Sequence, residues 1–211
     1  MELKDKLLSS YVAFENRVDT NSDVHDIRSE AFQNFEALGF PTKKQEAWKY
    51  TSLKTILKQD YSIFPNKENN VEFSDVKKYF IHEIDAYKLV FVDGKYNSFL
   101  SETTHGDFDV CLMSAALNKQ KYKAVIENYF NKIAKQDNLT SLNTAFTEEG
   151  AYIYIPKNVE VKKPIQIINF TTGSEAATML QPRNLIVVEE NSQVQIIERH
   201  QSLTNNPVLT N

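Results

Sequence analysis

The chain has 211 residues, 28 acidic and 24 Lys or Arg side chains, a net charge of −4, five glycines and one cysteine. The glycines lie too far apart for a phosphate-cradling loop, which excludes a Walker ATPase and a standard dinucleotide-binding domain. The single cysteine, Cys111, excludes an intramolecular disulfide, a four-cysteine zinc site and a self-contained four-cysteine iron–sulfur cluster.

Charge and hydropathy also limit the classes of partner that the chain can bind. A net negative chain lacks the basic footprint of a nucleic-acid binder. The longest apolar run, Ala151–Ile155, is far shorter than the about 20 residues of a membrane span. Residues 1–20 hold no apolar segment of the kind found in secretory signals. We therefore expect neither nucleic acid nor membrane as a partner, and a reducing, cytoplasmic location.

The composition changes along the chain. Val, Ile and Thr, which favour strands, make up 22 of residues 1–138 and 19 of the much shorter stretch 151–211. This shift predicts a mainly helical domain over residues 1–138 and a part built from strands over residues 139–211.

Two amphipathic helices are predicted first. Apolar residues spaced by three and four positions place one helix over residues 3–18 and a second over residues 24–38. Ser22 is expected to cap the second helix, and Gly39 is expected to end it.

Shorter elements follow. Thr42 and Gln45 match a capping box and predict a short third helix that carries Trp48. Another turn is expected near residues 53–57, and apolar spacing predicts a longer helix over residues 119–135.

A loop and a hairpin are expected between these helices. Residues 60–73 are polar and predict a loop. A strand over residues 89–92 runs into the dipeptide Asp93-Gly94, which favours a tight turn and a return strand over residues 96–100. The sequence thus predicts a small β-hairpin near residues 88–100.

The last part of the chain is predicted to hold short strands punctuated by prolines. The candidates are residues 152–155, 159–161, 165–170, 185–188 and 194–197. No helix of useful length fits between them, so either an antiparallel sandwich or a solenoid of parallel rungs remains. Since no Asn-Gly or Asp-Gly dipeptide follows residue 94, the solenoid is favoured.

Five strings, in this order, resemble one family. The most specific is GFPTKKQEAWKYT, and the others are FVDG, LNTAF, KPIQI and IIERHQS; they begin at residues 39, 91, 142, 163 and 196. Together they resemble the SufB/SufD family of the SUF iron–sulfur cluster assembly machinery, and SufD more than SufB.

The resemblance implies an N-terminal helical domain, a right-handed parallel β-helix whose first rungs lie in residues 139–211, and a C-terminal helical segment. It implies a non-catalytic scaffold subunit, not an enzyme, that acts with a SufB-like subunit and a SufC-like ATPase and receives sulfur from a desulfurase system. The iron–sulfur cluster is then the product of the full complex, and we expect this chain to bind no cofactor by itself.

The chain departs from the family pattern at its end. It stops at Asn211 without a cap for the solenoid or a helical segment. We expect a portion of a longer protein, with the ATPase-docking region and the main SufB-facing surface beyond residue 211. An uncapped end would favour self-association.

Few residues are candidates for chemistry. Cys111 lies among apolar neighbours and is expected to be a buried structural cysteine. Glu198 and His200 alternate along a strand and therefore point to one face, so they are candidates for a metal or an acid–base pair. The alternative for both is a charged rim on the solenoid.

The motif residues are expected to be structural rather than catalytic; they are Trp48, Tyr50, Thr51, Asp93, Gly94 and Asn143. The only tryptophan, beside two amphipathic helices, is more often core than interface. We expect Trp48 in the core, with a partner-binding pair of Trp48 and Tyr50 as the alternative.

Two other functions remain open. A β-helix enzyme acting on polysaccharide would need clustered acidic groups, but there is no Asp after residue 150. A generic protein-interaction adaptor is the second alternative.

Overall fold

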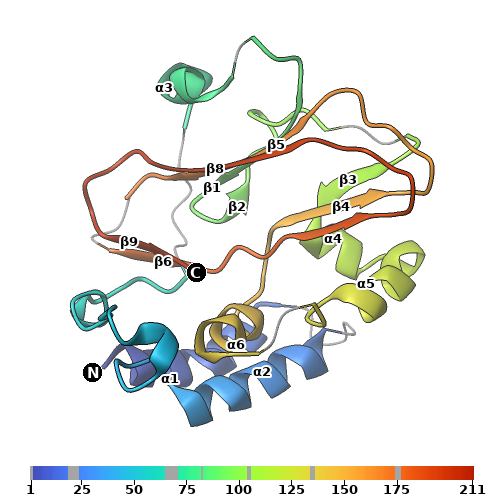
Figure 1. The fold of residues 1–211 in the computed structure, drawn as a ribbon. Coiled ribbons are helices and arrows are strands. Elements are labelled where there is room, and N and C mark those ends of the chain that lie inside the picture. Colours follow the sequence, from blue (N-terminus) through green and yellow to red (C-terminus); the bar gives the residue numbers. More distant parts are fainter. Residues whose placement is uncertain are drawn as a thin grey trace.

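The computed structural model describes residues 2–18, 24–64, 71–81, 83–103, 106–133, 136–173 and 177–211. The three longest helices lie along one side of the strands, so the fold is mixed α+β with a helical region ahead of the strands (Figure 1). The helical layer consists of α1 (Leu3–Glu15), α2 (His25–Leu38) and α6 (Asn138–Ala145).

The predicted apolar face of α1 is confirmed. Its buried side chains are Leu3, Leu7, Tyr11 and Phe14. They share one core with Phe35 of α2, Leu142 of α6 and Met179 of β6 (Thr178–Leu180). This core attaches the helical layer to the strands, because its members come from both. Burial of each large apolar side chain contributes about 1.5–3 kcal/mol to stability.

The second helix begins and ends close to the prediction. Val24 occupies its N-cap position, and the predicted cap Ser22 lies outside the described residues. Gly39 follows the helix with φ 61°, a conformation that glycine adopts without strain. Leu38, at the end of the apolar face expected for this helix, is 52% exposed, and Phe40 packs against the helical core instead.

Helix α6 has no counterpart in the sequence prediction, which expected the strand-built part from residue 139. Its sequence is mostly polar, so apolar spacing does not reveal it. The Asp137 side chain caps it by accepting hydrogen bonds from the backbone N–H groups of Leu139 (3.0 Å) and Thr140 (2.8 Å). The helix packs against α2, and tertiary contacts therefore outweigh its weak local pattern.

The short helix and the turn predicted after α2 are both single 3₁₀ turns. They are η1 (Glu46–Trp48) and η2 (Ile56–Lys58). The Thr42 N–H donates to Gln45 Oε1 at 3.0 Å, which is one half of the predicted capping box. The second half is missing, and no α-helix follows.

Two further regions differ in part from the predictions. The loop expected over residues 60–73 agrees with the described residues 60–64 and 71–72, which hold no helix or named strand, and residues 65–70 lie outside the described ones. The prediction missed α3 (Phe73–Val76) and η3 (Lys77–Tyr79), which follow. The helix expected over residues 119–135 is shorter.

That shorter helix is α5 (Lys123–Tyr129), preceded by α4 (Met113–Leu117) and η4 (Gln120–Tyr122). It ends because Phe130 is extended and Asn131 has φ 60°, which breaks the helical run.

The hairpin turn predicted at Asp93-Gly94 is present. It joins β1 (Tyr87–Val92) to β2 (Lys95–Tyr96). Both turn residues have positive φ, 48° and 77°, as a type I′ turn requires. The return strand is shorter than the predicted residues 96–100.

The strands form three sheets. One has the order β2-β1-β5-β8, the second β3-β4-β7, and the third β6-β9. Their remaining members are β3 (Asp109–Leu112), β4 (Ala151–Ile155), β5 (Ile165–Thr171), β7 (Leu185–Val188), β8 (Ile196–Ser202) and β9 (Val208–Thr210). The prediction missed β3, β6 and β9. It placed β8 too early and expected a strand over residues 159–161, where only an isolated bridge from Glu160 to Gln193 occurs.

The pairs formed within residues 151–211 are parallel: β4 with β7, β5 with β8, and β6 with β9. Between the members of each pair, the chain passes through one strand of each of the other two sheets. The antiparallel sandwich considered from the sequence is therefore wrong.

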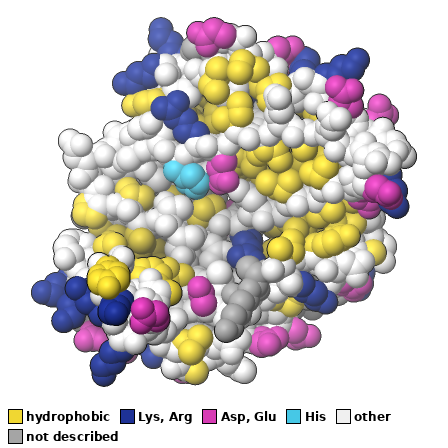
Figure 2. All heavy atoms as spheres, in the orientation of Figure 1, with side chains coloured by type: hydrophobic (Ala, Val, Ile, Leu, Met, Phe, Trp, Pro, Cys, Tyr) yellow, Lys and Arg dark blue, Asp and Glu magenta, His cyan; other side chains and the backbone are white. Residues whose placement is uncertain are grey.

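Strands β1 and β5 are buried on both faces. Leu89 of β1 and Ile167 of β5 face the core shared with β4, whereas Val90 and Phe170 face the core shared with α3. Burial on both faces explains the continuous apolar run Leu89–Val92 of β1, whereas β5 also buries the polar side chains of Gln166 and Asn169. In Figure 2, hydrophobic side chains gather between β8 and β7.

None of the helices in the described ranges has the length and hydropathy needed to cross a bilayer.

Candidate functional site

The structure brings Glu198 and His200 into contact on β8. His200 Nε2 lies 3.0 Å from Glu198 Oε1, as expected for alternate residues on one face of a strand. Their side chains are 43% and 46% exposed. The sequence prediction that the two residues share a face is confirmed.

Glu198 also joins two sheets. Asn184 Nδ2 donates to Glu198 Oε1 at 3.1 Å, and Asn184 Oδ1 accepts from the Ala151 N–H at 2.8 Å. The hydrogen bond from His200, together with that from Asn184, lowers the pKa of Glu198. The carboxylate therefore stays ionised at neutral pH and connects β8 to the start of β4.

The surroundings of His200 are polar but offer few metal ligands. His200 lines a cavity of about 150 Å³ together with Asn169, Thr171 and Ser202. No group of three His, Cys, Asp or Glu side chains lies together in the part of the chain that the structure describes. Since structural zinc sites use four protein ligands and catalytic ones three, Glu198 and His200 would need ligands from another chain or segment to hold a metal.

Cys111 lies on β3 and is buried, as predicted. It belongs to an apolar cluster with Tyr122 and Tyr152. Burial raises the pKa of its thiol, so the thiol stays protonated and is a poor nucleophile.

The motif over residues 39–51 lies at the surface. Trp48 is only partly buried and belongs to no core cluster of the described residues, and Tyr50 is 89% exposed. The expectation that Trp48 is core is therefore wrong. A single 3₁₀ turn presents no buried face, and Phe40 and Leu57 pack against the helical core instead. Thr51 is also exposed, and its N–H donates to Trp48 O at 3.0 Å.

The Asp93-Gly94 turn is attached to the end of β5. The Asp93 carboxylate accepts from the Thr172 N–H at 2.9 Å and from Thr172 Oγ1 at 2.6 Å. The Asp93 N–H donates to Phe170 O at 2.9 Å. Through these hydrogen bonds, Asp93 fixes the turn to the end of a distant strand, β5.

Asn143 connects three separate parts of the chain. Its Nδ2 donates to Pro182 O at 3.0 Å and to Asn211 O at 2.6 Å, and its Oδ1 accepts from Arg183 Nη1 at 3.1 Å. The Arg183 guanidinium also lies 5.5 Å from the centre of the Phe130 ring. Arg183 was missed by the sequence reasoning, because its partners lie 40 and more residues away and leave no local pattern.

A cleft of about 290 Å³ was also missed. Arg17 on its wall pairs with Glu148 through contacts of 2.9 and 3.1 Å. Beside them, Glu149 accepts from Ser114 Oγ at 2.7 Å and from the Gly150 N–H at 3.0 Å. Burial raises the pKa of Glu149. These contacts join the helical layer to α4 and to the start of β4, which is a structural role.

Comparison with known proteins identifies relatives in one family. Residues 1–167 match the family model for the SufBD protein N-terminal region. An iron–sulfur cluster assembly SufBD family protein from Synechocystis is 28% identical over 171 residues, which cover 81% of this chain and 37% of the relative.

SufD and SufB proteins are both similar to this chain. The Bacillus subtilis iron–sulfur cluster assembly protein SufD is 33% identical over 89 residues, or 41% of this chain and 20% of that protein. SufB of the same organism is 26% identical over 191 residues, or 90% of this chain and 33% of that protein. The preference for SufD over SufB thus has weak support.

The chain covers between 20% and 37% of the length of these three relatives. The family model nevertheless covers well over half of this chain. The chain therefore belongs to the SufBD family.

Proposed function

We propose that this chain belongs to a non-catalytic scaffold subunit of a SUF-type complex for iron–sulfur cluster assembly, in the cytoplasm. In this proposal the subunit acts with a SufB-like partner and a SufC-like ATPase, and the cluster is the product of the whole complex. Membership of the SufBD family carries the proposal, since the relatives are named for iron–sulfur cluster assembly.

The strand order supports the proposal that the strands after α6, within residues 139–211, open a right-handed parallel β-helix. Strands of the three sheets follow one another in a fixed cycle from β4 to β9. Parallel partners recur at a nearly constant spacing: Tyr152 pairs with Leu185, Ile165 with Ile196, and Thr178 with Val208. A solenoid stacks repeats of this length, each contacting its neighbours.

The chemistry of the described residues supports a scaffold role. The Glu198–His200 pair is bound to Asn184 and serves as a connection between sheets. The thiol of Cys111 is buried and protonated. A scaffold that obtains its nucleotide and sulfur chemistry from partner chains needs no catalytic group of its own.

The test is co-expression of the full-length protein with a SufB-like and a SufC-like subunit from the same genome. We expect all three to elute together in size-exclusion chromatography and to restore activity of an iron–sulfur enzyme in cells that lack the subunit. A full-length protein that elutes alone and fails to restore that activity would contradict the proposal.

A further inference from the structure

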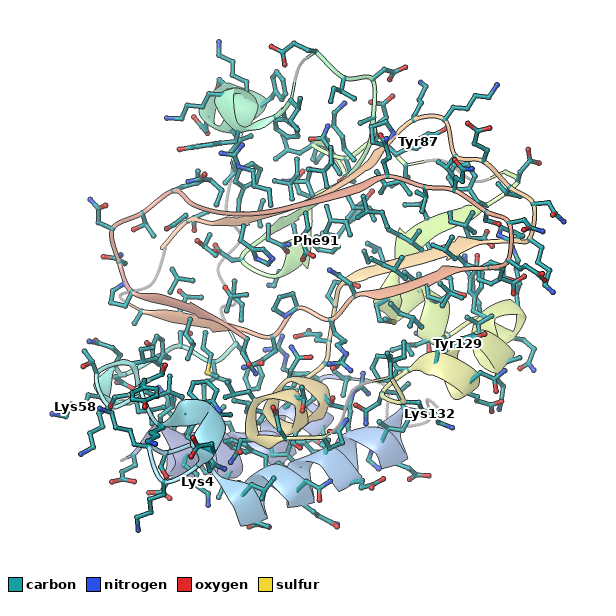
Figure 3. All side chains as sticks on the ribbon, viewed as in Figure 1. Lys4, Lys58, Tyr87, Phe91, Tyr129 and Lys132 are labelled. Carbon is teal, nitrogen blue, oxygen red and sulfur yellow. The ribbon has the colours of Figure 1, made fainter. Side chains whose placement is uncertain are left out.

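An open groove of about 900 Å³ lies where α1 begins. One wall comes from the first turns of α1 and the other from residues 54–60, which contain η2. We call it the lysine groove after the four lysines that line it: Lys4, Lys6, Lys54 and Lys58. Figure 3 shows Lys4 and Lys58 at this corner of the molecule.

Three of the four lysine charges are not neutralised by a carboxylate. Lys6 pairs with Asp60 at 2.6 Å. Lys4 Nζ donates to a backbone carbonyl, Glu36 O, at 2.8 Å. Within the described ranges, Lys54 and Lys58 form no ion pair, and both are exposed. The carboxylates of Glu2 and Asp60 also line the lysine groove, so four lysines and two carboxylates give it a formal charge of +2, on a chain whose net charge is −4.

The start of α1 adds to this positive potential. Glu2 stands at the N-cap position without a side-chain hydrogen bond to the helix. The first N–H groups of a helix point outward and carry partial positive charge. They act here together with the lysines and favour a negatively charged occupant.

The lysine groove also has an apolar part. Leu3 is buried, with 3% exposure, and lies beside Phe40 and Leu57, which are partly buried against the helical core. Figure 2 shows hydrophobic side chains among Lys and Arg side chains at the same corner. An apolar floor with a cationic rim matches an amphipathic segment that carries acidic residues along its edges.

We propose that the lysine groove docks an acidic amphipathic segment of a partner protein. This inference goes beyond the scaffold function and does not depend on it. A nucleic acid fits less well, because binding of a phosphate backbone by the lysines would leave the apolar floor of Leu3, Phe40 and Leu57 unused. A membrane surface fits less well, because the apolar residues are recessed in the floor, whereas membrane-binding faces present projecting apolar side chains.

The proposal is tested by binding of a synthetic amphipathic helical peptide of Glu and Leu, measured by fluorescence anisotropy on the full-length protein. The control peptide has Gln in place of Glu. The variants are Lys54→Glu/Lys58→Glu and the milder Lys54→Gln/Lys58→Gln. The matched control, Lys43→Glu/Lys44→Glu, makes the same charge change on exposed lysines outside the groove.

We expect the acidic peptide to bind at least about tenfold more tightly than its Gln counterpart, since charge complementarity sets partner choice. Charge reversal at Lys54 and Lys58 should weaken binding by about tenfold or more, and neutralisation should weaken it less. The control variant should bind within about twofold of the wild type at physiological salt, where distant exposed charges are screened.

Three outcomes would overturn the proposal. One is an acidic peptide that does not bind the wild type. The second is equal weakening by both charge-reversal variants, which would indicate a general charge effect. The third is tighter binding to vesicles of anionic phospholipid, or to a single-stranded oligonucleotide, with loss in Lys54→Glu/Lys58→Glu. Circular dichroism of each variant checks that the exposed substitutions leave the fold intact.

Discussion

The helical layer and the strand region are held in place by different kinds of contact. In the helical layer, apolar side chains such as Phe14 and Phe35 meet in one core. The strand region also has apolar cores, but the ends of its strands are fixed by polar side chains. Asp93, Asn143 and Glu198 each bind groups from a distant segment or another strand.

The contrast shows what each part of the sequence encodes. An amphipathic helix is specified by spacing that repeats within its own residues. The strands depend on pairs such as Asn143 and Arg183, which are 40 residues apart. Substitutions that remove apolar volume should therefore lower stability most in the helical layer. In the strand region, stability should depend more on how closely backbone segments approach and on single hydrogen bonds.

The largest effect is expected in the helical core. Phe14 is fully buried, so Phe14→Ala should lower the free energy of unfolding by about 4 kcal/mol, because it removes apolar contacts and leaves a cavity. Val12, on the opposite face of α1, is 70% exposed, and Val12→Ala should change stability by less than about 0.5 kcal/mol. Urea denaturation followed by circular dichroism measures both. Equal effects of the two variants would refute the helical core.

The next effect tests close backbone approach in the strand region. A Cβ on Gly150 would lie 1.9 Å from the carbonyl oxygen of Arg183. Gly150→Ala should therefore destabilise by about 3 kcal/mol, since two backbone segments must separate. Gly106 has no atom near its Cβ position, and Gly106→Ala serves as the control. Similar melting temperatures for the two variants would show that residues 150 and 183 are not this close.

Local pattern explains which parts of the fold could be predicted. The faces of α1 and the turn at Asp93-Gly94 depend on residues adjacent in sequence, and both predictions agree with the structure. The whole of β7 was predicted because its four residues, Leu-Ile-Val-Val, form an apolar and mainly β-branched run. Helix α6 was missed because its side chains are polar and its stability comes from packing on α2.

The candidate site was predictable only in part. The shared face of Glu198 and His200 follows from strand alternation. The Asn184 contact that fixes Glu198 crosses between sheets and has no local signal. The prediction for Trp48 was wrong for a related reason. The amphipathic helices near it in the sequence do not determine whether a single 3₁₀ turn faces the core.

A smaller effect is expected from one polar side chain of α6 that binds the strand region. Asn143→Ala removes hydrogen bonds to Pro182 O, Asn211 O and the Arg183 guanidinium. We expect a loss of about 2 kcal/mol, since buried groups are left without partners. Asn118→Ala, which removes one exposed bond to Ser114 O, should cost less than about 0.5 kcal/mol. A cost for Asn143→Ala no greater than that of the control would mean that apolar packing alone fixes the strand region.

The smallest effect concerns the Glu198–His200 pair and its pH dependence. The folded state lowers the pKa of Glu198 below its ordinary value of 4.5. A lowered carboxyl pKa contributes stability above the unfolded value, and this contribution is lost as pH falls through the folded value. Because both side chains are nearly half exposed, the contribution should be less than about 1 kcal/mol.

Glu198→Gln should therefore be slightly less stable than the wild type at pH 7, and the difference should shrink below pH 4.5 and vanish in acid below the lowered pKa of the folded state. Glu30→Gln, an exposed change on α2, should show no such difference at either pH. Thermal unfolding at both pH values measures the two variants. A deficit of Glu198→Gln that persists in acid would show that the glutamate acts through packing rather than through its charge. Apolar contact would then connect β8 to the start of β4, as it connects the helices of the helical layer. At this position the two regions would no longer differ in the kind of contact that holds them.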